Sequence, residues 1–381
     1  MQFRDLKKQY QVLQTEIDAA MQQVATSSAF IMGPQVKALE TELAEYVGVR
    51  HCLTCANGTD ALTLALKVWG VGPGDAVFVP DFTFFSSAEV VSLEGATPVF
   101  VDVYEGTFNI DVEDLERKVA ETIAKGELKP RVVVAVDLFG LPADYVGIRR
   151  VAEKYGLLIL EDGAQGFGGT LSGMRACSFG DISTTSFFPA KPLGCYGDGG
   201  AVFTDNDEWA TLIDSYRVHG KGSFKYDNVR IGMNSRLDTL QAAILQVKFR
   251  AFRENELDAV NRVASWYDER LGKLCMKDAL QTPFVPEGYR SSWAQYTIRL
   301  KDKTTRDALQ AYLKENIIPS MVYYPKPMHL QTAFSSLLGK GTADCPVATH
   351  LTDVVLSLPM HPYMSIEEVD TVCSAIFCFF S

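Results

Sequence analysis

The sequence predicts an α/β protein with a mainly parallel β-sheet, helices on both faces of that sheet, and a smaller second α/β domain. Three observations predict this fold class. Short apolar segments alternate with helical segments in the first half of the chain, a pattern typical of a parallel sheet. The chain has 381 residues, more than a single hydrophobic core usually supports. Beyond residue 236 the alternation gives way to a long helical stretch.

The elements of the first half follow from their periodicity and from where turn residues interrupt it. Strands are predicted at 51–55, 76–80, 97–103, 130–140, 157–162, 183–188 and 200–205. Helices are predicted at 62–70, 86–95, 111–120 and 145–156. The first of these helices ends in Gly70, a common helix terminator. The apolar run at 130–140 is continuous, as expected for a strand that is buried on both faces.

The second half indicates a separate, smaller domain. Residues 236–271 have helical spacing, and a strand at 294–300 and a helix at 304–316 follow. We therefore predict a large domain at 1–250 and a small domain at 251–381. The first 30 or so residues are expected to pack on the small domain.

Charge and hydropathy exclude several classes of partner. The net charge of −11 argues against nucleic acid and against an anionic membrane surface. The net charge does not exclude a small anionic substrate, because binding of such a substrate depends on the cations near its site. The basic stretch at 217–236 is either a binding site for an anion or a solvated loop. No apolar run is long enough for a bilayer, and the charged N-terminus lacks the core of a signal peptide. We expect a cytoplasmic protein.

The cysteines do not predict a metal site. Cys52 and Cys55 have C-x-x-C spacing, but no second pair exists and the five histidines are scattered. We expect buried, reduced thiols and no bound metal.

Two glycine-containing segments differ in their context. The run at 70–74 has a G-x-G beginning, but it follows a helix and precedes a strand, the reverse of a dinucleotide fingerprint. The segment around Gly58, Thr59 and Asp60 has the required order, from strand into helix. Thr59 or Asp60 lies near the helix N-cap, where free N–H groups attract anions, although simple capping explains the same residues.

Lys191 lies in an unusual setting. Pro189 and Pro192 flank it and fix a rigid, non-helical backbone, and a glycine-rich run follows at 194–200. Asp162 ends a buried strand, where a carboxylate needs a cationic partner. Asp162 therefore either forms a salt bridge, caps a helix, or faces a protonated ring nitrogen.

Together these features match the needs of pyridoxal 5′-phosphate (PLP): a phosphate cup, a stacking face, an acid for the ring nitrogen and a Schiff-base lysine. The residues are, in that order, Thr59 with Asp60, Phe84, Asp162 and Lys191; Ser186 could also donate to the phosphate.

At these residues the chain resembles the DegT/DnrJ/StrS-type nucleotide-sugar aminotransferases. The matching motifs lie at 31–40, 55–62, 81–89, 161–169, 186–200, 231–245, 323–329 and 356–363, nearly the whole chain. The resemblance implies the fold-type I aminotransferase architecture with a seven-stranded sheet and a homodimer with shared active sites. One departure is Gly163, where many relatives have alanine; we expect it to loosen the local packing slightly.

The resemblance also implies roles for individual residues. Lys191 would be catalytic and would form the Schiff base with PLP, Asp162 would pair with the ring nitrogen, and Gln165 would lie beside the ring oxygen. Phe84 would stack on the ring, and Asn234 would reach the phosphate in the neighbouring subunit. Around the phosphate we expect Gly58, Thr59, Asp60 and Ser186. As substrate-binding residues we expect Phe30, Arg217, His219, Arg230, Arg236, Tyr324 and His329.

The segment at 192–198 is most similar to the branch that aminates UDP-2-acetamido-2-deoxy-3-keto-glucuronic acid with glutamate. We therefore expect a PLP-dependent aminotransferase that acts on a UDP-linked 3-keto-hexuronic acid, for surface polysaccharide such as lipopolysaccharide O-antigen. The alternatives are amination at C4 or of a dTDP-linked 3-keto-6-deoxy sugar, a PLP-dependent dehydratase, and a non-catalytic regulator. Some relatives that act as dehydratases have histidine in place of the lysine, so Lys191 favours transamination.

Overall fold

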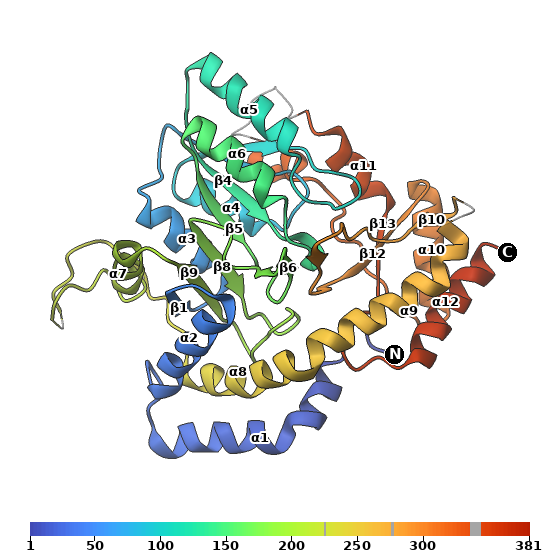
Figure 1. Ribbon diagram of the computed structural model, residues 1–381, viewed down its shortest axis with the longest axis horizontal. Helices are drawn as coiled ribbons and strands as arrows, with labels where there is room; N and C mark the ends of the chain where they lie inside the picture. Colours follow the sequence, from blue (N-terminus) through green and yellow to red (C-terminus); the bar gives the residue numbers. More distant parts are fainter. Residues whose placement is uncertain (225, 276–277, 336–343) are drawn as a thin grey trace.

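The computed structural model describes residues 1–224, 226–275, 278–335 and 344–381. A seven-stranded sheet forms its centre, with the strand order β1-β9-β8-β5-β4-β2-β3 (Figure 1). The bounds are β1 His51–Cys55, β2 Asp75–Pro80, β3 Thr97–Val101, β4 Lys129–Val136, β5 Leu158–Asp162, β8 Ile182–Ser186 and β9 Gly200–Thr204. Strand β9 is antiparallel to both of its neighbours, and the other six strands run parallel. The predicted fold class is confirmed, and the carboxyl ends of six strands meet at one edge.

Helices cover both faces of this sheet, and strand β4 shows how. Val132 and Val134 face one apolar cluster, whereas Val133 and Ala135 face another. The first cluster includes side chains of α3 (Gly58–Val68) and α4 (Ser86–Leu93), and the second includes side chains of α5 (Val112–Lys125) and α6 (Tyr145–Tyr155). The predicted strand at 130–140 ends early, at Val136, because residues 138–140 turn into a short 3₁₀ helix.

The helical stretch predicted from residue 236 is continuous but not uniform. Helix α8 (Thr239–Ala251) passes through a π-helical turn, Phe252–Glu256, into α9 (Leu257–Cys275). The proposed domain boundary at 250/251 therefore falls inside one helical run. Helix α1 (Leu6–Ser27) lies along α8 at the bottom of Figure 1, with Ile17 packed against Ile244 and Val247. This segment also contacts the predicted small domain: Gln9 Nε2 of α1 donates to Glu256 Oε1 at 2.9 Å, and before α1 Met360 N donates to Phe3 O at 3.1 Å.

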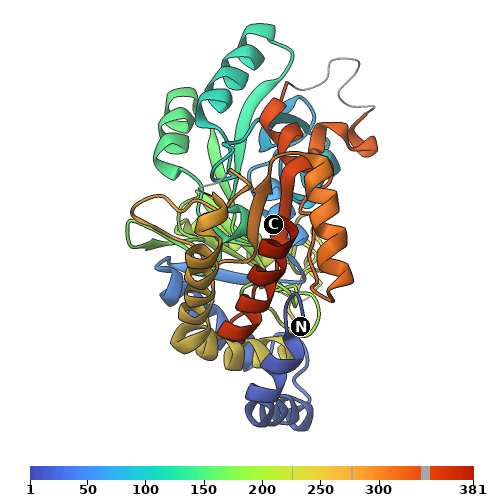
Figure 2. The same ribbon diagram turned by 90° about the vertical axis from the view of Figure 1, so that its right-hand side faces the viewer.

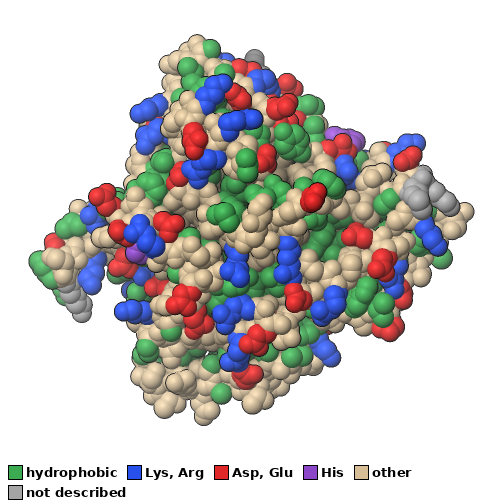
Figure 3. Space-filling view, viewed as in Figure 1, with side chains coloured by type: hydrophobic (Ala, Val, Ile, Leu, Met, Phe, Trp, Pro, Cys, Tyr) green, Lys and Arg blue, Asp and Glu red, His purple; other side chains and the backbone are tan. Residues whose placement is uncertain are grey.

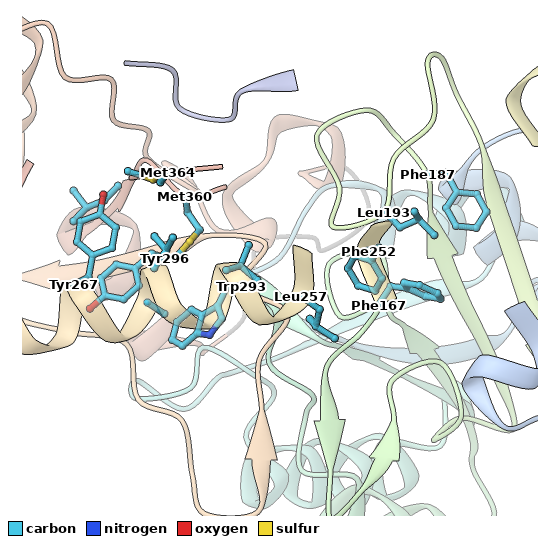
Figure 4. Close-up of a cluster of buried hydrophobic side chains, with 14 of the residues drawn as sticks. Phe167, Phe187, Leu193, Phe252, Leu257, Tyr267, Trp293, Tyr296, Met360 and Met364 are labelled. Carbon is cyan, nitrogen blue, oxygen red and sulfur yellow. The ribbon is translucent and has the colours of Figure 1, made fainter. Parts of the chain in front are cut away.

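The C-terminal part has its own three-stranded sheet, β10-β12-β13, packed with α10, α11 and α12 (Figure 2). The bounds are β10 Leu280–Gln281, β12 Tyr296–Leu300, α10 Lys303–Glu315, α11 Pro346–Val354, β13 Val355–Leu358 and α12 Ile366–Phe379. A buried cluster joins this part to the large sheet. It runs from Phe187 and Leu193 past α9 to Tyr267 and Tyr296 (Figure 4).

Several short strands were not predicted. β6 (Thr170–Leu171), β7 (Met174–Arg175) and β11 (Tyr289–Arg290) form a further small sheet, in which a strand from the C-terminal half pairs with one from the first half. Two-residue strands carry too few side chains to show a period of two. No helix among the described residues combines the length and the apolar character needed to cross a bilayer.

Gly163, directly after β5, is packed more tightly than we expected. A Cβ atom at this position would lie 2.7 Å from Cys177 Sγ and 3.0 Å from Thr184 O. The prediction of looser packing is therefore wrong, because the Cys177 side chain occupies the space that an alanine methyl group would take.

We predict that Gly163→Ala lowers the free energy of unfolding by about 1–3 kcal/mol, the usual cost of overpacking. Removing the Cys177 sulfur should relieve the clash, so the double variant Gly163→Ala/Cys177→Ala should lose less than the sum of the two single changes. Urea denaturation of the wild type and the three variants measures this coupling. Additive losses would show that the two positions do not compete for space.

Candidate active site

A cavity of about 670 Å³ lies at the edge where the parallel strands end. It is bounded by residues that follow four of these strands and by Tyr324 from the C-terminal part. The predicted residues in its wall are Gly58, Thr59, Asp60, Phe84, Asp162, Gln165, Ser186, Lys191 and Tyr324. Apart from Tyr324, the sheet topology brings these residues together, because β1, β2, β5 and β8 all end at this edge.

The N-terminus of α3 forms one end of the cavity. The cap is Asn57, whose side chain accepts a hydrogen bond of 2.8 Å from Asp60 N, so Thr59 and Asp60 lie in the first turn, near the cap as predicted. Gly58 packs directly on the end of β8: a Cβ atom there would lie 2.7 Å from Ser186 Cβ. Thr59 Oγ1 lies 3.1 Å from the Ser86 hydroxyl. The free N–H groups and hydroxyls gathered here suit a phosphate group.

Asp162 is held by a set of hydrogen bonds that the sequence analysis did not include. It is buried, with 6% of its surface exposed. Ser87 Oγ donates to Asp162 Oδ2 at 2.7 Å, and Ala164 N donates to Oδ1 at 3.2 Å. Thr83 Oγ1 lies 3.1 Å from Ser87 Oγ, so two hydroxyls stand in line behind the carboxylate. The serine and threonine residues of the motif at 81–89 were the feature of the sequence that could have indicated these hydrogen bonds.

One backbone hydrogen bond closes the turn around Lys191. Lys191 N donates to Phe188 O at 2.9 Å, between the two prolines. Burial lowers the pKa of the Lys191 amine, the charge of Arg4 acts in the same direction, and Asp162 opposes both. A lowered pKa increases the neutral fraction of the amine near neutral pH, and the neutral amine is the nucleophilic and basic form.

Aromatic side chains line the opposite wall. Phe84 is 53% exposed, unusual for a phenylalanine, and its ring centroid lies 6.2 Å from that of Tyr324. Gln165 Nε2 donates to the Tyr324 hydroxyl at 3.0 Å, while Gln165 Oε1 accepts from Phe139 N at 2.7 Å. Burial raises the pKa of Tyr324, so its hydroxyl keeps its proton. An exposed ring at the cavity wall is available to stack on a flat ligand.

Two residues predicted to bind substrate are used elsewhere in the fold. Arg217 is buried, and its guanidinium pairs with Glu40 and Asp214, each at 2.6 Å, and donates to Thr54 O at 2.7 Å. His329 Nδ1 lies 2.5 Å from Asp81 Oδ2, and both side chains are buried away from the cavity wall. We do not carry either forward as a substrate ligand, because neither residue lines the cavity and each is held by a carboxylate elsewhere.

Other predicted residues lie on a projecting segment, 217–236, which extends from the body at the left of Figure 1. Hydrophobic and basic side chains gather on this projection in Figure 3. His219, Arg230 and Arg236 line a separate hollow of about 1110 Å³ there. Arg236 Nη2 donates to Asn234 Oδ1 at 2.6 Å. Neither these residues nor Phe30, which is 46% exposed, lines the cavity.

Acidic side chains outnumber basic ones in the wall of the cavity. Asp60, Asp162 and Asp198 lie in its wall, and among the residues that the structure describes Lys191 is the one cationic side chain there. A phosphate ester in this cavity therefore depends on helix N–H groups and hydroxyls within its own subunit.

The residues present fit PLP. The absence of a side chain at Gly58 lets the N-terminus of α3 approach Ser186 closely, so helix N–H groups and a hydroxyl meet where a phosphate group is favoured. A buried carboxylate, an exposed aromatic ring and an amine with a lowered pKa share one cavity. PLP requires this set of groups from a protein.

Comparison with known proteins agrees with this reading of the site. The sequence signature of the DegT/DnrJ/EryC1/StrS aminotransferase family matches residues 11–377. A UDP-2-acetamido-2-deoxy-3-oxo-D-glucuronate aminotransferase from Pseudomonas aeruginosa is 42% identical, over 99% of both chains. A dTDP-3-amino-3,6-dideoxy-α-D-galactopyranose transaminase from Aneurinibacillus thermoaerophilus is 36% identical, over 98% of both chains.

Among solved structures, an aminotransferase of this family from Brucella abortus superposes with a TM-score of 0.94. It is 48% identical and is covered over 99% of its length by the whole of this chain. The sequence match, the fold and the cavity agree, and the chain belongs to the DegT/DnrJ/EryC1/StrS aminotransferase family of PLP-dependent sugar aminotransferases.

Proposed function

We propose that the protein transfers the amino group of glutamate to the C3 keto group of a UDP-linked 2-acetamido-2-deoxy-3-keto-hexuronic acid, a step in surface polysaccharide synthesis. The observation that carries this choice is the full-length similarity to the P. aeruginosa enzyme, which acts on such a sugar. The A. thermoaerophilus transaminase favours a second candidate, a dTDP-linked 3-keto-6-deoxy sugar, at lower identity.

Residues of this chain would divide the chemistry among them. Bound PLP supplies the electron sink for the bond changes at the amine-bearing carbon. Asp162, held by Ser87 and Ala164, would stabilise a proton on the ring nitrogen. The Lys191 amine would accept a proton from the donor's carbon and return one to the sugar carbon, and its lowered pKa suits it to the first of these steps. Phe84 and Tyr324 would hold the ring.

We also propose that the enzyme works as a homodimer in which the projecting segment completes the partner's cavity. Three carboxylates and one lysine line the cavity, so a sugar diphosphate needs cations from elsewhere. His219, Arg230 and Arg236 are available on the projection of a second copy, and Asn234 would reach the partner's phosphate. Phe224 and Ile231 on the same segment are 65% and 91% exposed, as expected of a surface that another copy covers.

The substrate is tested with a panel of UDP-, GDP- and dTDP-linked keto sugars, with glutamate and PLP, by mass analysis of the products. We expect glutamate-dependent amination of the UDP-linked 3-keto-hexuronic acid and none by Lys191→Ala, which lacks the proton-transferring amine. Preferential amination of a dTDP-linked or 4-keto sugar would contradict the proposed substrate. Sugar turnover without glutamate would contradict transamination itself.

Ser87→Ala should lower kcat with little change in KM for either substrate. The variant removes one hydrogen bond to the Asp162 carboxylate, worth about 1.5–3 kcal/mol for a charged group, so kcat should fall about tenfold to a hundredfold. Ser92→Ala, on the same helix, is the matched control, because the Ser92 hydroxyl is buried without a partner. Equal rates for the two variants would show that Ser87 does not support Asp162.

The shared site predicts complementation between two inactive chains. After dissociation and exchange of subunits, Lys191→Ala mixed with Asn234→Ala should regain activity, because a mixed dimer holds one site with neither defect. Each variant alone serves as the control, and native mass spectrometry counts the mixed dimers. Proven heterodimers without activity would contradict the sharing of sites.

A further inference from the structure

Residues 3–5, which precede α1, connect the C-terminal part of the chain to the turn at 188–192 that contains Lys191, here called the lysine turn. Phe3 O accepts a hydrogen bond of 3.1 Å from Met360 N, and the Phe3 ring meets the Tyr323 ring edge-on at 6.2 Å. Asp5 then caps α1 by accepting from Lys8 N at 2.8 Å. The segment Phe3–Asp5 is thus fixed at both of its ends.

Arg4, between these two anchors, contacts the main chain of the catalytic lysine. Its Nη2 atom donates to Lys191 O at 2.7 Å and lies 3.5 Å from Pro192 O. Pro189 and Pro192 have no N–H to donate, so the turn makes few backbone hydrogen bonds of its own. A charge-assisted bond to the carbonyl of Lys191 fixes the point from which its side chain leaves.

We propose that Phe3–Asp5 is a strap that fixes the lysine turn to the C-terminal part of the chain, with Arg4 as a positioning residue for transamination. The proposal rests on the family's reaction and not on the identity of the sugar, so it stands whichever nucleotide sugar is the substrate.

The charge of Arg4 adds a second effect. Burial lowers the pKa of its guanidinium to about 10 and Glu256 opposes this, so Arg4 stays charged at neutral pH. The charged groups that face Lys191 are Asp162, which raises its pKa, and Arg4, which lowers it. Lys248 and His361 also face Arg4. Without Arg4, the Lys191 amine should therefore become harder to deprotonate.

The first test measures Lys191 in the PLP-free protein. Competitive labelling with acetic anhydride over a pH series, read by peptide mass spectrometry, gives the titration of this amine. In Arg4→Gln, which loses the charge, the curve should shift to higher pH, whereas in Arg4→Lys it should stay close to that of the wild type. Lys7→Gln removes an exposed cation from the same end of α1 and is the control. An unshifted Arg4→Gln curve, or an equal shift in Lys7→Gln, would overturn the electrostatic role.

The second test measures the turn itself. Amide hydrogen exchange at residues 187–195 should be faster in both Arg4 variants than in Lys7→Gln, because the Nη2 atom makes the bond to Lys191 O and a lysine side chain ends one atom short of that position. With PLP bound, kcat of Arg4→Gln should fall about tenfold with KM nearly unchanged, as for the loss of one charge-assisted hydrogen bond. If Arg4→Gln fails to fold, Arg4→Lys provides the test. Amide hydrogen exchange at residues 187–195 of Arg4→Lys that equals that of the wild type would overturn the proposed strap.

Discussion

The site depends on the hydrogen bonds that hold the buried Asp162 carboxyl group at the end of β5. A buried carboxylate is costly unless donors surround it, and here a serine hydroxyl and a backbone N–H supply them. The opposing charges of Asp162 and Arg4 act together on Lys191, so the state of its amine is set by both neighbours and by burial. The parallel strands make this possible, because they bring residues far apart in sequence to one edge.

The same edge leaves the subunit short of positive charge. The cavity wall holds three carboxylates and one lysine, while basic side chains gather on a projection outside it. Arg217 belongs to the basic stretch of the sequence but is not available to a ligand, because its guanidinium pairs inside the protein with Glu40 and Asp214. The proposed dimer would reconcile the acidic cavity with the proposed anionic substrate, since the partner's projection would bring the missing cations.

Much of the fold could be predicted from the sequence, because strands that are buried on both faces have continuous apolar runs and their helices have clear periodicity. The same logic placed Asp162 and Lys191 at strand ends, where the structure has them. Contacts between distant segments could not be predicted. Arg4 lies 187 residues from Lys191, and no local pattern links the two. The position of Ser87 in its helix does not distinguish it from other serines in the sequence, and only the structure shows that its hydroxyl donates to Asp162.

The central claim is that Lys191, among all the lysines of the chain, is the one that bonds PLP. Reduction of the PLP-bound protein with sodium borohydride makes that bond permanent, and peptide mass spectrometry locates it. We predict that the cofactor mass appears on the peptide that contains Lys191 and is lost in Lys191→Ala. Cofactor on Lys248, a buried lysine on which the charge of Arg4 also acts, or on no lysine would contradict the account.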